Sequence, residues 1–308
     1  MRIEKQTSST RREIVFYLAL ASAMVCAFTA LTAAQSREMP AIVSPDWLSK
    51  NLSNPGMVIL DIRSVEQYKK GHIPGSLNTP LSLWAVNRDG LTLELPPEDA
   101  LRDLIGKSGI DASSHIVIVN RIDTDFNRAD STRVAWTCSY AGIQNTAILD
   151  GGYNRWLKEI KSTSTEISNA KPGVYTGKIN PTVLASKAYV SGKLGRSVIV
   201  DTRLPEDYFG IASKPGHIKH SVNLPTPWAF ANDGTLRKVE DLQAMASGVI
   251  GENKSQEVIL YCGVGGYAST WWFLLTHLLG YQNVKVYDGS MEEWVKDPQS
   301  PVTAYCWH

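Results

Sequence analysis

The sequence predicts an α/β protein built from two similar modules, and three observations lead to this expectation. Short runs of β-branched residues alternate with longer amphipathic segments, the pattern of βα units around a mostly parallel sheet. A set of short motifs occurs twice in the same order. One apolar run, residues 258–261, delivers Cys262 into a glycine-containing loop before a helix-like segment. Parallel α/β sheets place reactive groups at the carboxyl ends of strands, so this loop is the candidate site.

The composition of the 308-residue chain is globular, with 43% hydrophobic and 20% charged residues, and the length suits two ordinary domains. The formal net charge is +1. Outside the first 34 residues, acidic and basic residues nearly balance. This neutral balance argues against a nucleic-acid-binding protein or a polyanionic partner.

Residues 1–34 have the pattern of a secretory signal peptide. Arg11 and Arg12 precede a charge-free run over 14–34, and small residues at Thr32 and Ala34 predict cleavage after Ala34. A run of this length can also span a bilayer as an uncleaved anchor, although its Ser, Thr and Ala content favours cleavage. We therefore expect a periplasmic protein that meets a membrane only if this segment is retained.

Three cysteines remain after the predicted signal, because Cys26 lies within it. An odd number predicts at least one free thiol, and so few cysteines argue against a disulfide scaffold. Cys138 falls in a helical stretch and is expected in the core. Cys306 is interpreted as an exposed tail residue, with a resolving thiol for Cys262 as the alternative. No metal-ligand spacing is present, and we expect no cofactor.

An internal repeat divides the remaining chain into a first module (40–160), a linker (161–174) rich in Ser, Thr, Lys and Pro, and a second module (175–308). In the second module, 198–200, 258–261 and 284–287 are predicted strands, and 241–247 and 268–279 are predicted helices. The matched segments are 57–63 with 197–203, 71–75 with 216–220, Asp89-Gly90 with Asp233-Gly234, 116–119 with 258–261, and Asp150-Gly151 before Trp156 with Asp288-Gly289 before Trp294.

The two modules differ at the candidate site. Aligned on the matched strands, Cys262 corresponds to Asn120. The loop over 120–130 is four residues longer than its counterpart and has no thiol. We therefore expect chemistry in the second module only, with the first module as a structural partner that walls one side of a shared cleft.

With these motifs the chain resembles the tandem-domain rhodanese (sulfurtransferase) family, over nearly the whole length after the signal. The resemblance is carried by Asp201-Thr202-Arg203, Gly216-His217-Ile218, the loop from Cys262 to Ala268, and Asp288-Gly289 before Trp294. It implies a five-stranded parallel sheet flanked by helices in each domain, a persulfide-forming cysteine in the C-terminal domain, and a substrate-binding role for Arg203. The chain departs from the family at Gly263 and Val264, where members that prefer thiosulfate carry basic residues. It also departs at Tyr267, where family members often carry Arg or Thr, and at Asp207, where an arginine is usual.

The glycines around Cys262 let backbone N–H groups converge on one point, and the helix start adds partial positive charge there. We expect the Cys262 thiol to ionise more readily than free cysteine and to act as the nucleophile of ping-pong sulfur transfer. The resemblance implies a small anionic donor such as thiosulfate or 3-mercaptopyruvate, and a thiol, cyanide or an exported protein as acceptor. The expected substrate-binding residues are Arg203, Gly263, Val264, Gly265, Gly266, Tyr267 and Ala268.

Other interpretations stay open. The chain is alternatively a degenerate rhodanese-like binding or sulfur-carrier module with little turnover. Arg203 has near-equal prospects of touching substrate and of bracing its own domain, and His72 and His217 are expected to be structural. Of Trp271 and Trp272, one is expected in the core and the other in the cleft. A phosphatase-like activity is disfavoured, because no arginine follows Cys262 before the helix.

Overall fold

The computed structural model describes residues 37–213 and 215–305. The predicted signal segment over 1–34 and Cys306 lie outside this part of the chain, so both remain expectations. No helix among the described residues is long and apolar enough to cross a membrane.

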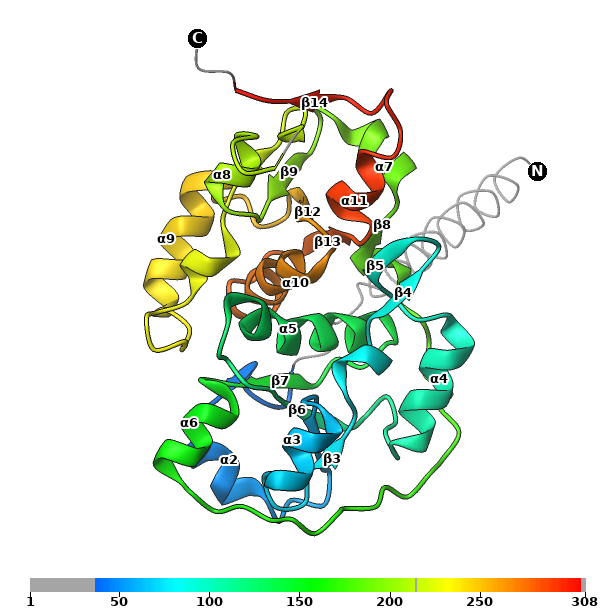
Figure 1. Cartoon of the computed structure of the whole chain (residues 1–308), viewed down its shortest axis with the longest axis vertical. Helices are drawn as coiled ribbons and strands as arrows, with labels where there is room; N and C mark the ends of the chain where they lie inside the picture. Colours follow the sequence, from blue (N-terminus) through cyan, green and yellow to red (C-terminus); the bar gives the residue numbers. More distant parts are fainter. Residues whose placement is uncertain (1–36, 214, 306–308) are drawn as a thin grey trace, which may run out of the picture. The chain divides into compact units, whose positions relative to one another are not determined.

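Two five-stranded sheets, parallel throughout, confirm the predicted fold class (Figure 1). The order in both sheets is the same once the repeat is taken into account, since every strand of the first has its counterpart at the same place in the second. The first sheet runs β1 (Ile42–Val43), β7 (Thr146–Leu149), β6 (His115–Val119), β2 (Met57–Asp61), β3 (Leu77–Asn78). The second runs β8 (Leu184–Ala185), β13 (Asn283–Tyr287), β12 (Glu257–Tyr261), β9 (Val198–Asp201), β11 (Val222–Asn223).

Helices follow the strands in both modules. Ser44 and Ser186 are equivalent N-caps, and each hydroxyl accepts a hydrogen bond from the N–H three residues further on, which satisfies a donor at the helix start. The first module contains α2 (Pro45–Asn51), α3 (Val65–Lys70), α4 (Glu98–Lys107), α5 (Asp125–Tyr140) and α6 (Gly152–Glu159), with a 3₁₀ turn η1 (Leu81–Leu83). The second contains α7 (Lys187–Lys193), α8 (Pro205–Tyr208), α9 (Val239–Val249), α10 (Gly266–Phe273) and α11 (Ser290–Trp294), with 3₁₀ turns η2 (Pro181–Val183) and η3 (Thr226–Ala229).

Two antiparallel pairs complete the architecture. The strands β4 (Val86–Arg88) and β5 (Leu91–Glu94) form a hairpin in the first module. The short β10 (His217–Ile218) pairs with β14 (Val302–Thr303) near the end of the chain.

Helices α5 and α10 lie side by side between the two sheets and join the modules (Figure 1). The hydroxyls of Thr132 and Thr270, which are equivalent in the repeat, are 2.9 Å apart across this contact. Cys138 of α5 is fully buried, as expected, and burial raises the pKa of its thiol. The largest apolar core cluster draws residues from both modules, so a single core extends across the contact.

The helix after Cys262 begins earlier than predicted. Gly265 adopts a left-handed conformation (φ 80°) as N-cap, so α10 starts at Gly266 and not at 268, and a π-helical turn η4 (Leu274–Leu278) ends it. Trp271 and Trp272 are both buried, which contradicts the prediction that one of them faces the cleft. The reason is that α10 packs against its sheet on one side and against α5 on the other, and both tryptophans lie on these covered sides. The predicted helix 241–247 is longer in the structure, where α9 covers Val239–Val249.

The segment 161–174, which was interpreted as a linker, runs without helix along the first module. His72 and Ser164 exchange two backbone hydrogen bonds. Further along, the Gly173 N–H donates to the carbonyl of Gly106 at 2.9 Å. The segment is therefore fastened to the first module by its backbone before the second module begins.

Candidate functional site

Cys262 directly follows the central strand of the second sheet. Val258, Ile259, Leu260 and Tyr261 in β12 are fully buried, as the apolar run predicted, and β12 is paired on both edges. The Cys262 N–H donates to the Ser290 hydroxyl at 3.1 Å, and the Cys262 carbonyl accepts from the Met291 N–H at 3.1 Å. The start of α11 thus fixes the backbone that carries the thiol.

The loop after Cys262 is held from one side and open on the other. The Gly263 carbonyl accepts from the Glu292 N–H at 3.0 Å. In the described part of the chain, no acceptor is present for the N–H groups of Gly263 and Val264. Free N–H groups beside a helix start favour an anion, in agreement with the geometry expected for a thiolate or persulfide.

Gly265 occupies a position that accepts no side chain. Besides its positive φ, a Cβ there would lie 2.7 Å from the Asp288 Oδ1 and 2.8 Å from the Asp288 carbonyl oxygen. Asp288 is therefore packed directly beneath the loop, and its side chain sets where the loop can lie.

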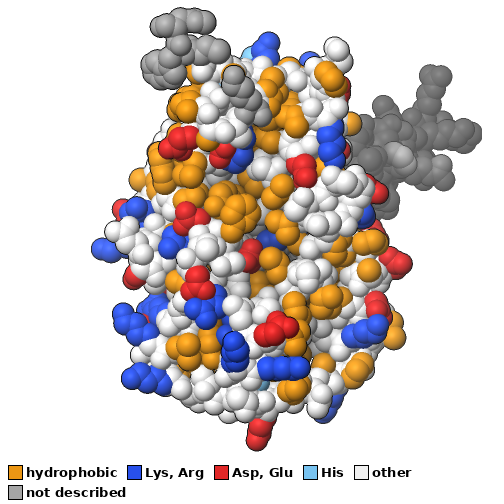
Figure 2. All heavy atoms as spheres, in the orientation of Figure 1, with side chains coloured by type: hydrophobic (Ala, Val, Ile, Leu, Met, Phe, Trp, Pro, Cys, Tyr) orange, Lys and Arg blue, Asp and Glu red, His pale blue; other side chains and the backbone are white. Residues whose placement is uncertain are grey.

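A pocket of about 320 Å³ opens beside Cys262, large enough for a small ligand. Cys262 is 2% exposed and lines it, and its thiol has no hydrogen-bond partner among the described residues. Figure 2 shows hydrophobic side chains gathered over this region, with acidic side chains beside them. The lining residues are Phe126, Arg203, Asp207, Ser213, Cys262, Gly263, Val264, Tyr267, Met291, Glu292 and Val295.

Four of the expected substrate-binding residues, Arg203, Gly263, Val264 and Tyr267, line this pocket. The other three, Gly265, Gly266 and Ala268, are buried and are absent from its lining. The difference arises because the chain enters α10 at Gly266, which turns these residues toward the core. They shape the loop and do not face the pocket.

Arg203 braces its own module. Its Nη2 donates to Asp201 Oδ2 at 2.6 Å and to the Gly216 carbonyl at 2.7 Å. Arg63 makes the equivalent bonds to Asp61 and Gly71 in the first module, which has no cysteine at the position equivalent to Cys262. Arg203 differs in reaching the pocket, where its Nη1 donates to the Ser213 hydroxyl at 3.3 Å.

His72 and His217 have matching structural contacts outside the pocket lining. Each imidazole Nδ1 bonds a tyrosine carbonyl, at 2.9 Å from Tyr68 and 2.7 Å from Tyr208, and each ring stacks on that same tyrosine. The shared geometry fits the structural role expected from their presence in both modules.

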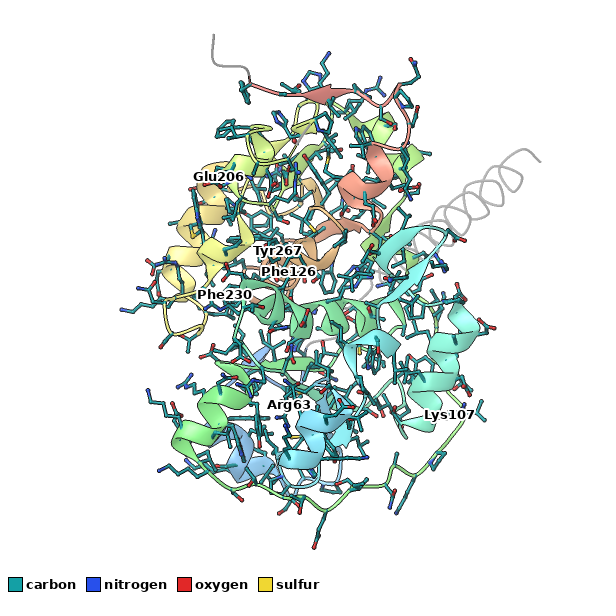
Figure 3. The ribbon with its side chains drawn as sticks, in the orientation of Figure 1. Arg63, Lys107, Phe126, Glu206, Phe230 and Tyr267 are labelled. Atoms are coloured by element: carbon teal, nitrogen blue, oxygen red, sulfur yellow. The ribbon has the colours of Figure 1, made fainter. Side chains whose placement is uncertain are left out.

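The first module contributes to the pocket wall, as predicted, through residues that the sequence did not single out. Phe126, at the start of α5, packs its ring 4.9 Å from that of Tyr267, and Figure 3 shows the two side chains meeting between the modules. Arg133, also on α5, forms a buried ion pair with Asp288. A sequence signal for Phe126 exists in hindsight, since it lies in the part of the first module that is longer than its counterpart.

The chain carries two copies of one known domain. The family model described as a rhodanese-like domain matches residues 44–159 and 186–297. The chain belongs to the rhodanese family. Among its relatives are the sulfur carrier protein TtuD of Thermus thermophilus, 28% identical over 82% of this chain and 93% of the relative, and the thiosulfate sulfurtransferase of Azotobacter vinelandii, 28% identical over 86% of this chain and 97% of the relative.

Solved structures with the same fold include YnjE and the wild-type form of EanB. YnjE matches with a TM-score of 0.74 at 22% identity, covering 86% of this chain and 68% of its own. EanB matches with a TM-score of 0.74 at 20% identity, covering 86% of this chain and 69% of its own. At these identities the structural likeness shows the rhodanese fold alone.

Proposed function

We propose that this protein is a sulfurtransferase that carries sulfane sulfur as a persulfide on Cys262. Membership of the rhodanese family and the names of its relatives support sulfur transfer. The observation that carries the proposal is the position of Cys262, which lines a ligand-sized pocket and precedes two N–H groups that have no acceptor among the described residues. The equivalent Asn120 has its amide bonded to Asp130 at 2.9 Å, and the first module has no thiol there.

The transfer proceeds in two halves. The Cys262 thiolate attacks the outer sulfur of the donor, a sulfur–sulfur or sulfur–carbon bond of the donor breaks, and the donor's leaving group takes the electron pair. The new persulfide is then attacked at its outer sulfur by an acceptor, and Cys262 leaves as the thiolate. The loop N–H groups suit both states because each is an anion.

The donor is proposed to be thiosulfate, 3-mercaptopyruvate or a polysulfide, and the acceptor a thiol, cyanide or an exported protein. Arg203 is the cation of the described pocket lining that could bind an anionic donor. Its bonds to Asp201 leave it less available for this than an unpaired arginine. The weak cationic character also supports a second candidate, a sulfur carrier with little turnover that receives sulfur from another protein. We further propose that the protein is exported to the periplasm and loses residues 1–34.

Intact-mass measurement tests the proposal. Protein recovered from cells is measured before and after exposure to thiosulfate, 3-mercaptopyruvate and polysulfide. The expected result is a one-sulfur increment in the wild type and in Cys138→Ser, whose thiol is buried in α5, and no increment in Cys262→Ser. Absence of the increment with every donor would exclude sulfur transfer, while loading without thiocyanate formation from cyanide would favour the carrier. The same spectrum reports whether residues 1–34 are present.

A further inference from the structure

We propose that the acceptor of the Cys262 sulfur is a small aminothiol with a positive charge, and that Asp207 and Glu292 select it. This inference rests on the proposed function, since it names the class of molecule that empties the persulfide. It differs from the anionic ligands that the family resemblance implies.

The charges of the described pocket lining carry the argument. Arg203, Asp207 and Glu292 are its charged side chains. The guanidinium of Arg203 is occupied by Asp201, which it meets through both Nε and Nη2. Asp207 and Glu292 form no ion pair within the part of the chain that the structure describes. Arg203 also reaches Asp207 through the Ser213 hydroxyl, so this one cation is shared between Asp201 and Asp207. With Glu292, the carboxylates outnumber the cation, and the excess negative charge near the thiol attracts cations.

Hydrogen bonds hold both carboxylates in place without neutralising them. Asp207 Oδ1 accepts from the Ser213 hydroxyl at 2.6 Å. Glu292 accepts from the Thr92 N–H at 2.7 Å and from the Thr92 hydroxyl at 3.0 Å, and Thr92 belongs to the β4–β5 hairpin of the first module. A fixed carboxylate needs little reorganisation to meet an ammonium group, because the cost of ordering its side chain is already met in the fold.

An aromatic wall strengthens the preference for a cation. The Phe126 and Tyr267 rings, 4.9 Å apart, both line the pocket. Burial raises the pKa of Tyr267 to about 12, so its phenol stays neutral and adds no charge of its own. The faces of such rings attract ammonium groups. Figure 3 shows both side chains reaching the same place from different modules.

The division of roles follows from this geometry. The N–H groups of Gly263 and Val264, which follow Cys262 in the chain, are assigned to the sulfur, and the carboxylates and rings of the pocket lining are assigned to the rest of the acceptor. The acceptor thiol gives its proton to the outer sulfur of the Cys262 persulfide anion and attacks that sulfur as the thiolate, the bond between that sulfur and Sγ breaks, and Cys262 leaves as the thiolate. The product is the acceptor persulfide, which keeps the proton, and no oxidant or reductant is consumed.

Single-turnover transfer tests the inference separately from the proposed function. The protein is loaded with polysulfide, freed of excess, and its persulfide is confirmed by intact mass. Loss of the persulfide is then timed with cysteamine, 2-mercaptoethanol and 3-mercaptopropionate, which are cationic, neutral and anionic thiols of similar size. Each rate is divided by the rate of the same thiol with a small-molecule persulfide. This corrects for the different intrinsic reactivities of the three thiols.

The wild type is expected to favour cysteamine over 3-mercaptopropionate by at least tenfold at low salt, with the preference falling as ionic strength rises. Asp207→Asn and Glu292→Gln should each reduce the preference severalfold. Glu206→Gln is the matched control, because Glu206 precedes Asp207 on α8 but is exposed and is absent from the pocket lining. It should leave the preference unchanged.

Three outcomes would overturn the inference while leaving the proposed function intact. The first is equal corrected rates for the three thiols, and the second is a cysteamine preference that survives both substitutions. The third is a preference for 3-mercaptopropionate that Lys214→Gln abolishes. This result would assign acceptor selection to Lys214, which lies outside the described residues. Failure to load any persulfide would instead count against the proposed function.

Discussion

Asp150 and Asp288 occupy equivalent positions after β7 and β13, and each accepts a backbone hydrogen bond from the other module. The Leu95 N–H donates to Asp288 at 2.8 Å, and the Leu236 N–H donates to Asp150 at 3.0 Å. Each module thus donates a hydrogen bond to the other from the segment that follows its first Asp-Gly pair, Asp89-Gly90 or Asp233-Gly234. These bonds are symmetric although only the second module has a cysteine in the loop after its central strand.

The cations that meet these two aspartates differ. Asp150 pairs with Arg155 of its own module at 2.6 Å, in a partly exposed position. The residue equivalent to Arg155 is Glu293, so Asp288 receives its cation, Arg133, from the other module. The first module therefore pairs its aspartate with its own arginine, while the second module depends on the first for the cation that pairs with the aspartate beneath its loop.

Replacement of Arg133 tests that dependence and should have the largest effect. The side chains of Arg133 and Asp288 are 1% and 5% exposed, so Arg133→Met leaves a buried carboxylate without its partner and should cost about 3–5 kcal/mol of unfolding free energy. Arg155→Met is the matched control. Its side chain is 30% exposed, and the loss should be about 1 kcal/mol or less. Urea unfolding of both variants measures the difference, and equal losses would contradict the asymmetry.

The loop glycines provide a comparison within the active module. Gly265→Ala forces a left-handed residue against Asp288 and should cost about 2 kcal/mol and lower the rate of persulfide formation at least tenfold. A Cβ at Gly263 meets no atom within 4 Å, so Gly263→Ala should change stability by less than about 0.5 kcal/mol. Thermal unfolding and donor-loading rates check both. A Gly265→Ala variant that loads at the wild-type rate would show that the loop tolerates displacement.

The β4–β5 hairpin of the first module also makes the stability of the protein depend on pH. Glu94 of β5 is buried near Asp288, and burial followed by the Asp288 charge raises the pKa of Glu94 to about 7. Below about pH 4.5 both folded and unfolded forms hold the proton. Between pH 4.5 and 7 the unfolded form releases it first, so stability falls as pH rises, by about 3 kcal/mol in all.

Glu94→Gln should remove this decline. The expected difference between variant and wild type appears in urea unfolding as the pH passes from 4.5 to 7, with Glu98→Gln, an exposed acid on α4, as control. Parallel pH profiles for wild type and Glu94→Gln would contradict the assignment. In the second module, the residue before Leu236 is Thr235, which does not ionise. This pH dependence of stability therefore arises in the first module only.

The sequence was sufficient for features that are local or repeated. The strand 258–261, the thiol after it and the order of the βα units follow from patterns within each module. Arg133 and Phe126 were missed, because their roles depend on contacts between modules that no motif within a module reveals. Helix α5 shows why: nine of its residues are buried, from Ala129 to Ser139, and such a helix lacks the one-sided pattern that would locate its partner.

The reciprocal bonds of Leu95 and Leu236 have a consequence for how such a chain is divided. A fragment that keeps only the second module would lose Phe126 from the pocket lining and Arg133 from beneath the Cys262 loop. It would also lose Thr92, the hydrogen-bond donor to Glu292. The pocket beside Cys262 and the support beneath its loop are therefore built from both modules. The first module is therefore not a redundant copy, because its side chains line and support the pocket beside Cys262.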